Sequence, residues 1–440
     1  MRLSLATWGR VPATITRPGY DVRTLKSGMV HLGLGAFHRA HQAVYTDLAL
    51  AAAGGDWGTI GVSMRKPDVA AAFVPQGGLY TVETLDAETD YRVVGAVRQT
   101  LTLPLETERV LAALASSDTH VVTLTVTEKG YRLDGAGELD LTHPDILHDL
   151  GVPQLPRSAV GVLAAAFARR IAEGAGGLTV ISCDNLSDNG ARLAGAVHAF
   201  AERAWPGLAP QLERIASFPQ TVVDCIVPAS DATSRARVDA ALGLEDAGSV
   251  QREAFSQWVI EDRFAGPRPA WDRVGVEIVA DVAPHRRLKL HVLNAAHSAL
   301  AYLGLLAGRT LVREAIADPD LSAFVEGMVL EEIAPALPGL PVVRYWAEVR
   351  RRFANPAIDH RLDQIALDGP QKLAQRIFPL MLANARADLP VARLGRVVRA
   401  WMDWTARTSG VKPDLGDPSL FPPELRALPT ARSAILGEAA

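Results

Sequence analysis

The sequence contains very little cysteine. Its 440 residues include only Cys183 and Cys225, which lie far apart and form no metal-ligand pattern. Disulfide frameworks of small secreted proteins and cysteine-based zinc sites are therefore not expected. No apolar run reaches the length of a membrane span, and the first residues lack the long apolar core and cleavage site of a signal peptide. These absences make a reduced, cytoplasmic protein the default expectation.

An excess of charge of one sign is also absent. The net charge of -4 is small for this length and no basic stripe appears, so nucleic acid is not an expected partner. Hydrophobic residues make up 48% of the chain and charged residues 21%, the balance of a globular protein with a large core. A chain of 440 residues is too long for one ordinary domain and suggests two or three.

The first half of the chain alternates short apolar runs with helical patterns. The runs that predict strands are "MVHLGLG", "GTIGVSM", "THVVTLTVT" and "LTVISCDN". The patterns that predict helices cover residues 40–54, 159–177 and 190–205. Strands separated by helices indicate a parallel sheet with helices on both faces.

Beyond about Pro284 helical periodicity dominates. We therefore predict an α/β fold, with a dinucleotide-binding, Rossmann-like domain at residues 1–283 and a mostly α-helical substrate domain at residues 284–440. The proline-rich tail after Val411 is expected to be irregular and to cover the surface.

A glycine turn closes the first predicted strand in "HLGLGAFHRAH". Small residues there allow a nucleotide pyrophosphate to approach the backbone, and the next helix offers free N–H groups. The third glycine of the usual fingerprint is missing, and His38 stands in its place. The alternative is a simple tight turn. The cofactor-binding candidates of this stretch are Gly33, Gly35, Ala36, Phe37, His38 and Arg39.

The end of the second predicted strand should carry a ribose-binding acid. Ser63 and Met64 stand there instead, followed by Arg65 and Lys66. The loop therefore leaves NAD and NADP both open, and Arg65 is a cofactor-binding candidate. The end of the third predicted strand adds three more candidates: Thr127, Glu128 and Lys129.

Three polar residues, Lys289, Asn294 and His297, interrupt the apolar stretch "KLHVLNAAHSALAYLG". On an α-helix, at about 100° per residue, they would share half of the helix surface. A lysine with a lowered pKa can act as general acid or base, an amide can steady an oxyanion, and a neutral histidine can hold a hydroxyl. The alternative for each residue alone is an ordinary packing role.

A second polar insertion, "VISCDNLSDNG", ends the fourth predicted strand. The carboxyl ends of parallel strands are where such sheets bind ligands, so Asp184 or Asn185 could face the cofactor cleft. The alternative is a turn, because Asp and Asn are common turn residues.

The chain resembles the polyol-specific long-chain dehydrogenase/reductase family, which includes mannitol 2-dehydrogenase and fructuronate reductase. Six blocks between about residues 29 and 380 carry the resemblance, in the order of the family: "HLGLGAFHRAHQAVYTD", "TLTVTEKGY", "VISCDNLSDNG", "WVIEDRFAGPRPAW", "KLHVLNAAHSALAYLG" and "IALDGPQKLAQRI". The resemblance implies a Rossmann-like domain, a helical domain and zinc-independent catalysis with NAD.

The resemblance also assigns residues. It implies that Lys289 is the catalytic acid–base and that Asn294 and His297 hold the substrate. Asn185 would join Asn294 around the reacting oxygen. The implied substrate-binding residues are Asp224, Lys372 and Arg361, the last because Gln364 replaces an arginine found in some relatives. Arg286 stands where many members carry a carboxylate three residues before the lysine, and this departure leaves the proton route open.

The preferred interpretation is an NAD-dependent oxidoreductase that interconverts mannitol and fructose. The alternative within the family is fructuronate reductase, also called D-mannonate oxidoreductase. The alternative from another class is a non-catalytic nucleotide- or carbohydrate-sensing protein. The expected partner is a small polyol, ketose, hexonate or keto acid; no metal or membrane is expected, and a monomer is the expected state.

Overall fold

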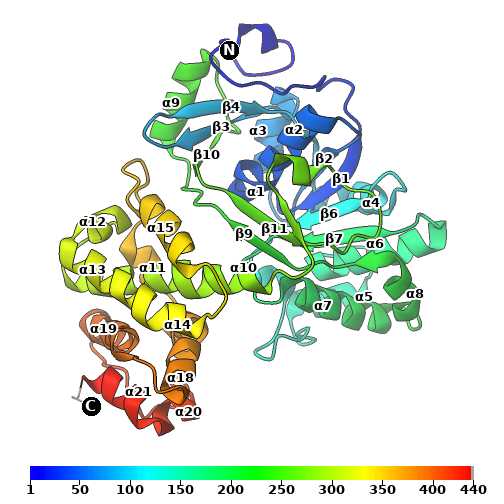
Figure 1. Ribbon diagram of the computed structural model, residues 1–440. Coiled ribbons are helices and arrows are strands. Elements are labelled where there is room, and N and C mark those ends of the chain that lie inside the picture. The colour runs from blue at the N-terminus through cyan, green and yellow to red at the C-terminus, as the bar shows by residue number, and fades with distance from the viewer. Residues whose placement is uncertain (438–440) are drawn as a thin grey trace. The chain divides into compact units, whose positions relative to one another are not determined.

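The chain divides into two compact units, one spanning Met1–Val282 and one beginning at Ala283. The computed structural model describes residues 1–437 (Figure 1). The first unit is built around β-sheets and the second is mostly helical, which confirms the predicted fold class. Each unit has hydrophobic cores of its own.

A six-stranded parallel sheet organises the first unit. Its strands lie in the order β5-β2-β1-β6-β7-β8. Their bounds are Val97–Thr102, Gly58–Ser63, Ser27–Leu32, Val121–Leu124, Leu178–Ser182 and Ala216–Ser217. Counted along the chain, this is the 3-2-1-4-5-6 order of a dinucleotide-binding fold. The order reverses between β1 and β6, so a ligand is expected beyond the carboxyl ends of these two strands.

Both faces of this sheet are covered. On one face Val30, Val122 and Val180 pack against helices α4, α6 and α7. On the other face Met29 and Ile181 pack with residues of α2 and of a smaller sheet. The alternation follows from the two-residue period of a strand, and both sets are apolar because a parallel sheet is buried on both sides. The helices of this unit are α1 (Ala36–Ala40), α2 (Gln42–Ala53), α3 (Asp68–Phe73), α4 (Leu103–Ala115), α5 (Pro144–Gly151), α6 (Ala159–Glu173), α7 (Asn189–Ala204), α8 (Ala209–Ile215) and α9 (Ala232–Leu242).

Two three-stranded sheets complete the first unit, and sequence patterning did not identify them. One has the order β10-β3-β4 and the other β12-β11-β9. Their bounds are Val250–Glu253, Tyr80–Leu85, Asp90–Val94, Glu277–Val279, Gln257–Glu261 and Thr221–Asp224. Each sheet includes a pairing between segments far apart in sequence, such as β10 with β3, which no local signal marks. The pairing of β3 with β4 is a local antiparallel hairpin, which the sequence patterning missed.

The second unit is a helical assembly around one apolar core. Its helices are α10 (Ala283–Leu288), α11 (Asn294–Leu306), α12 (Val312–Ala317), α13 (Pro319–Gly327), α14 (Ala334–Ala336), α15 (Val342–Phe353), α16 (Leu362–Ala366), α17 (Gly369–Arg376), α18 (Phe378–Arg386), α19 (Ala392–Ser409), α20 (Pro423–Ala427) and α21 (Pro429–Leu436). Two π-helical turns interrupt the series, Lys289–Leu293 and Met328–Ile333.

The tail after Val411 is more regular than predicted. It contains α20 and α21, and it buries Phe421, Leu425 and Ile435 in the core of the second unit. Prolines misled the prediction, because Pro423 and Pro429 stand in the first turns of these helices, where a missing N–H costs nothing. The tail is therefore part of the core rather than an irregular cover.

A buried arginine joins two elements of the first unit. Arg170 is 1% exposed, and its guanidinium donates to the carbonyls of Leu114 (3.0 Å) and Ser116 (2.6 Å) at the end of α4. The same group donates to Ala175 (3.0 Å) and Gly177 (3.1 Å) in the loop before β7. Carbonyls without helical partners are thereby satisfied inside the core.

We predict that Arg170→Met lowers the free energy of unfolding by about 2–5 kcal/mol, because it leaves several buried carbonyls unpaired. Urea unfolding measures the loss. The matched control is Arg169→Met, which removes partly exposed ion pairs with Glu108 and Glu173 and should cost about 0–1 kcal/mol. Equal losses in the two variants would contradict the role assigned to Arg170.

Candidate functional site

A cavity of about 360 Å³ opens beyond the carboxyl ends of β1, β2 and β6. This is the point at which the strand order reverses. Its walls are Gly33, Leu34, Gly35, Ser63, Met64, Arg65, Lys66, Thr125, Val126, Thr127, Gly130, Arg132, Arg157, Ser158 and Ala159. Position and size suit part of a dinucleotide.

Gly33 forms the floor of this cavity, where β1 and β6 meet. It has a φ of +95°, and a Cβ at this position would collide with the carbonyl oxygen of Thr125. Only glycine fits such a backbone. The glycine therefore lets the ends of β1 and β6 pack closely beside the cavity. Binding of a pyrophosphate at this turn stays a prediction.

His31 fixes the Gly33 carbonyl of the glycine turn through a hydrogen bond. Its Nε2–H donates to the Gly33 carbonyl (3.1 Å) and to the Thr125 hydroxyl (2.8 Å), and that hydroxyl donates to the same carbonyl (2.8 Å). Because a carbonyl can only accept, the proton lies on Nε2, and Nδ1 accepts from Thr123 (2.7 Å). Burial lowers the pKa of His31 to about 3, so the ring is neutral.

The predicted cofactor residues divide into two groups. Four of them line the cavity: Gly33, Gly35, Arg65 and Thr127. Six do not: Ala36, Phe37, His38, Arg39, Glu128 and Lys129. His38, at the place of the third glycine, is 1% exposed and stacks on His31 at 3.5 Å between ring centroids.

Arg39 has partners of its own. Its guanidinium donates to the carbonyls of Gly35 (3.1 Å) and Gly248 (2.6 Å) and lies over the Phe73 ring. These contacts hold the side chain against the protein, and its role in cofactor binding stays a prediction. Its neighbourhood could not be read from the sequence, because Gly248 lies 209 residues away.

A half-buried carboxylate shapes the turn after β6. Asp184 accepts from the backbone N–H groups of Val126 (3.0 Å) and Thr127 (2.9 Å) and from the Tyr131 hydroxyl (2.6 Å). Thr127 has a φ of 67°, which residues other than glycine rarely adopt. Burial raises the pKa of Asp184, although these hydrogen bonds favour its charged form. The Asp184 carboxylate thus fixes the backbone of Val126 and Thr127, which line the cavity.

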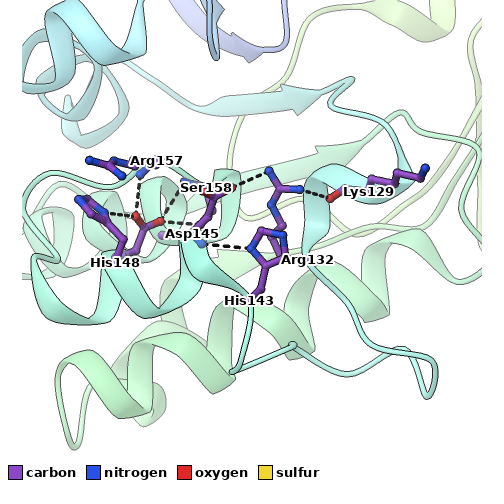
Figure 2. Close-up of polar contacts among 9 residues, drawn as sticks. Lys129, Arg132, His143, Asp145, His148, Arg157 and Ser158 are labelled. Atoms are coloured by element: carbon purple, nitrogen blue, oxygen red, sulfur yellow. Dashed lines mark hydrogen bonds and ion pairs between the residues drawn. The ribbon is translucent and has the colours of Figure 1, made fainter.

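A second carboxylate, Asp149, holds the cavity-lining residues Arg157 and Ser158 in place. Asp149 is fully buried and accepts from the backbone N–H groups of Arg157 (2.8 Å) and Ser158 (2.9 Å) and from the Ser158 hydroxyl (2.7 Å). That hydroxyl also accepts from Gly161 N–H (2.9 Å), which caps α6. Nearby, Arg132 forms an ion pair with Asp145 (2.7 Å), and Figure 2 shows the two side chains. Sequence reasoning missed this wall, although Ser158 before a long helix was a capping signal.

The candidate catalytic helix in the second unit is not an α-helix throughout. Lys289–Leu293 form a π-helical turn, in which the Asn294 N–H donates to the Lys289 carbonyl. The α-helical geometry assumed for this stretch is therefore wrong over these residues. The five-residue hydrogen bond places Asn294 one turn above Lys289. Such π-helical turns are frequent at functional sites.

His297 follows on α11 in a confined setting. It is 7% exposed, and its ring lies tilted against Phe353 at 4.3 Å and edge-on to His360 at 5.2 Å between ring centroids. Burial, followed by the charges of His360 and Arg376, holds its pKa well below the usual value. Within residues 1–437 its Nε2 is buried without a hydrogen-bond partner. A neutral imidazole with an unused nitrogen can hold a hydroxyl group.

The predicted substrate residues occupy different settings. Lys372 on α17 donates to the Ile365 carbonyl (3.0 Å), and its charge lowers the pKa of His297 and of His360. Arg361 is exposed and forms a two-pronged ion pair with Asp363 (3.0 and 2.6 Å). In the first unit Asp224 ends β9 and is buried, and Asn185 is exposed in the loop after β7.

Arg376 was not among the predicted site residues, yet it contacts this helix. Its guanidinium donates to the Asn294 carbonyl (3.3 Å) and the Ser298 hydroxyl (3.1 Å). It stands one turn after Lys372 on α17. The sequence hint was the four-residue spacing of two cations on one helix.

Residues 1–437 contain no group of three or more His, Cys, Asp or Glu side chains placed to hold a metal ion. No helix in that range combines the length and the hydrophobicity needed to cross a membrane.

We predict that the stability of the first unit falls as the pH drops below about 6.5. An unfolded histidine protonates near pH ~6.5, whereas His31 stays neutral down to about pH 3. Between these values the unfolded state binds more protons, which costs at most about 1.4 kcal/mol per pH unit. Urea unfolding at pH 7.5, 6.5 and 5.5 measures this. His31→Gln should give a shallower pH dependence; an unchanged slope would refute the contribution of His31.

Two family models match the chain, one in each of its two units. A model described as the mannitol dehydrogenase Rossmann domain matches residues 27–273. A second, described as the mannitol dehydrogenase C-terminal domain, matches residues 281–431. Together they span most of the sequence.

Individual relatives agree over nearly the whole length. A D-mannonate oxidoreductase of Escherichia coli (strain K12) is 39% identical over 417 residues, which cover 92% of this chain and 86% of that protein. A mannitol 2-dehydrogenase of Phaeosphaeria nodorum is 38% identical over 398 residues, covering 88% and 70%. The solved structure of Pseudomonas fluorescens mannitol 2-dehydrogenase, in ternary complex with NAD and D-mannitol, matches with a TM-score of 0.87 and 32% identity over 99% of this chain and 95% of that one. The chain belongs to the mannitol dehydrogenase family of oxidoreductases.

Proposed function

We propose that this enzyme interconverts a polyol or aldonate and the corresponding 2-ketose or 2-keto acid with NAD(H), and that mannitol and fructose are its preferred pair. The observation that carries the proposal is the π-helical turn at Lys289, with Asn294 one turn above it and the neutral His297 beyond. The match to a mannitol 2-dehydrogenase solved with NAD and D-mannitol supports the choice of substrate and cofactor.

The residues around the cavity suit the cofactor. Gly33 lets β1 and β6 end in close contact at the cavity, and Ser63 presents a buried hydroxyl without a hydrogen-bond partner in the described chain. We assign the pyrophosphate to the turn at Gly33–Gly35 and the adenosine ribose to the loop at Ser63–Lys66. When bound, NAD(H) accepts or supplies the hydride at C2 of the substrate.

Lys289 is the proposed acid–base. In oxidation its neutral amine removes the proton of the C2 hydroxyl, and in reduction its ammonium returns that proton. The Asn294 side-chain N–H donates to the same oxygen as its charge develops, which is the role of an oxyanion donor. By the family resemblance Asn185 is the second donor.

His297 is the proposed positioning group for a neighbouring hydroxyl. Its neutral ring can accept or donate one hydrogen bond at Nε2, whereas a charged ring could only donate. Burial and the surrounding cations keep it neutral over the working pH range. The ring contact with Phe353 fixes its orientation.

A second candidate is the reduction of a hexuronate such as fructuronate. The charges of Arg352, Lys372 and Arg376 all reach His297 and lower its pKa. Such cations would suit a substrate carboxylate. A 39% identical D-mannonate oxidoreductase supports this candidate as well.

Initial rates with a substrate panel test the proposal. The panel contains mannitol, arabinitol, sorbitol and mannonate with NAD, and fructose and fructuronate with NADH, read at the nicotinamide absorbance band. We expect the highest kcat/KM for the mannitol–fructose pair. A clear preference for mannonate and fructuronate would favour the second candidate, and no turnover of any member would contradict both.

We predict that Lys289→Met lowers kcat by about 10²–10⁴, because a positioned acid–base contributes about that much. NADH binding, followed by fluorescence, should persist. In the parent enzyme the oxidation rate should rise with pH and the reduction rate should fall, since the two directions need opposite protonation states. The variant should lose this dependence.

The matched control for this prediction is Lys412→Met, which removes an exposed lysine of the same unit that pairs with Asp403 at 2.7 Å. It should keep the parental rate and pH profile. A Lys289→Met enzyme with the parental profile would show that the lysine has a structural role only.

A further inference from the structure

The ribose end of the cavity has an unusual set of groups for an NAD site. Strand β2 ends at Ser63, where a carboxylate would normally bind the ribose hydroxyls and repel a 2′-phosphate. Ser63 is 7% exposed and lines the cavity, and its Oγ is buried without a hydrogen-bond partner in the part of the chain described. A hydroxyl in this state can donate to an incoming oxygen.

Two cationic side chains follow Ser63 closely in the sequence. Arg65 and Lys66 line the same cavity, and within residues 1–437 their side chains take part in no hydrogen bond or ion pair. Arg132 lies on the opposite side but is already paired with Asp145. Among the described residues, no aspartate or glutamate lines the cavity.

The carboxylates beside the cavity already have hydrogen-bond or ion-pair partners within the protein. Asp184 and Asp149 accept backbone N–H groups of its two walls, as described above, and Asp145 pairs with Arg132. Their negative charge is thus compensated by groups of the protein itself. The surface offered to a ligand beyond β2 is a hydroxyl followed by a guanidinium and an ammonium, a combination suited to a phosphate.

We propose that Ser63, Arg65 and Lys66 form a subsite for a 2′-phosphate, so that the enzyme uses NADP(H) alongside NAD(H). This rests on the proposed dinucleotide function of the cavity and extends it. Arg65 and Lys66 bind the phosphate oxygens, and the Ser63 hydroxyl donates to the phosphate or, in NAD(H), to the ribose.

The competing role for Arg65 is stacking on the adenine. Stacking would strengthen NADH and NADPH binding equally, because both carry the same adenine. A phosphate contact strengthens NADPH alone. The ratio of the two dissociation constants therefore separates the two roles.

Direct binding tests the subsite without any sugar substrate. NADH and NADPH fluorescence titrations of the full-length enzyme should give Kd values within about tenfold of each other. Adenosine 2′,5′-diphosphate should displace NADH more strongly than adenosine 5′-diphosphate does, and this advantage should shrink at high salt. Undetectable NADPH binding, or equal displacement by the two diphosphates, would overturn the proposal.

Variants locate the contact. Arg65→Ala/Lys66→Ala should raise the Kd ratio of NADPH to NADH by about tenfold or more, the loss expected from two charge-assisted hydrogen bonds. Arg23→Ala/Lys26→Ala removes the same two residue types before β1, outside the cavity, and should leave the ratio unchanged. Ser63→Asp should raise the ratio as well, with NADH binding reporting that the variant is folded. An unchanged ratio in Arg65→Ala/Lys66→Ala would refute the subsite.

The two proposals fail in different ways. If NADH binds and a polyol turns over but NADPH does not bind, the dehydrogenase function stands and the subsite is wrong. If both nucleotides bind and no polyol or aldonate reacts, the subsite stands and the proposed substrate class is wrong.

Discussion

The cavity depends on one close approach, that of Gly33 to the carbonyl oxygen of Thr125. The missing side chain lets β1 and β6 end in contact at the point where the strand order reverses. His31 and the Thr125 hydroxyl then fix the Gly33 carbonyl from below. Because His31 and its stacked neighbour His38 are fully enclosed, both are held neutral. The geometry of the turn is thus set by burial as much as by the glycine.

The same region shows a consistent division of charge. Asp149 is buried and Asp184 is half-buried, and each accepts two backbone N–H groups of residues that line the cavity or adjoin it. A buried carboxylate must be compensated, and backbone donors do this without a cation. The arginines and lysines near the opening are therefore not needed as partners for these acids. The positive charges of Arg65 and Lys66 therefore remain available to a ligand that carries phosphate groups.

Part of this arrangement could be predicted from the sequence. The glycines after a β-branched strand, the polar interruption at Lys289, and six ordered family blocks gave the fold class and the family, and the structure and the comparisons confirm both. What could not be predicted depends on distant partners. Arg39 contacts Gly248, and Asp149 shapes a helix start that is nine residues away from it. The π-helical turn was also invisible, because its apolar pattern is compatible with an ordinary α-helix.

The helical unit uses burial in a related way. His297 is enclosed by Phe353 and His360, and three further cations act on it. Desolvation alone lowers its pKa, and each nearby positive charge lowers it further. A histidine in such a place cannot act as the cationic partner of a substrate carboxylate, so that role would fall to the lysine and arginines of the same region. Under the proposed function, the neutral ring would bind a substrate hydroxyl group, whereas the cations would favour an acid over a neutral polyol. Substrate orientation and substrate class would then depend on different side chains of the helical unit.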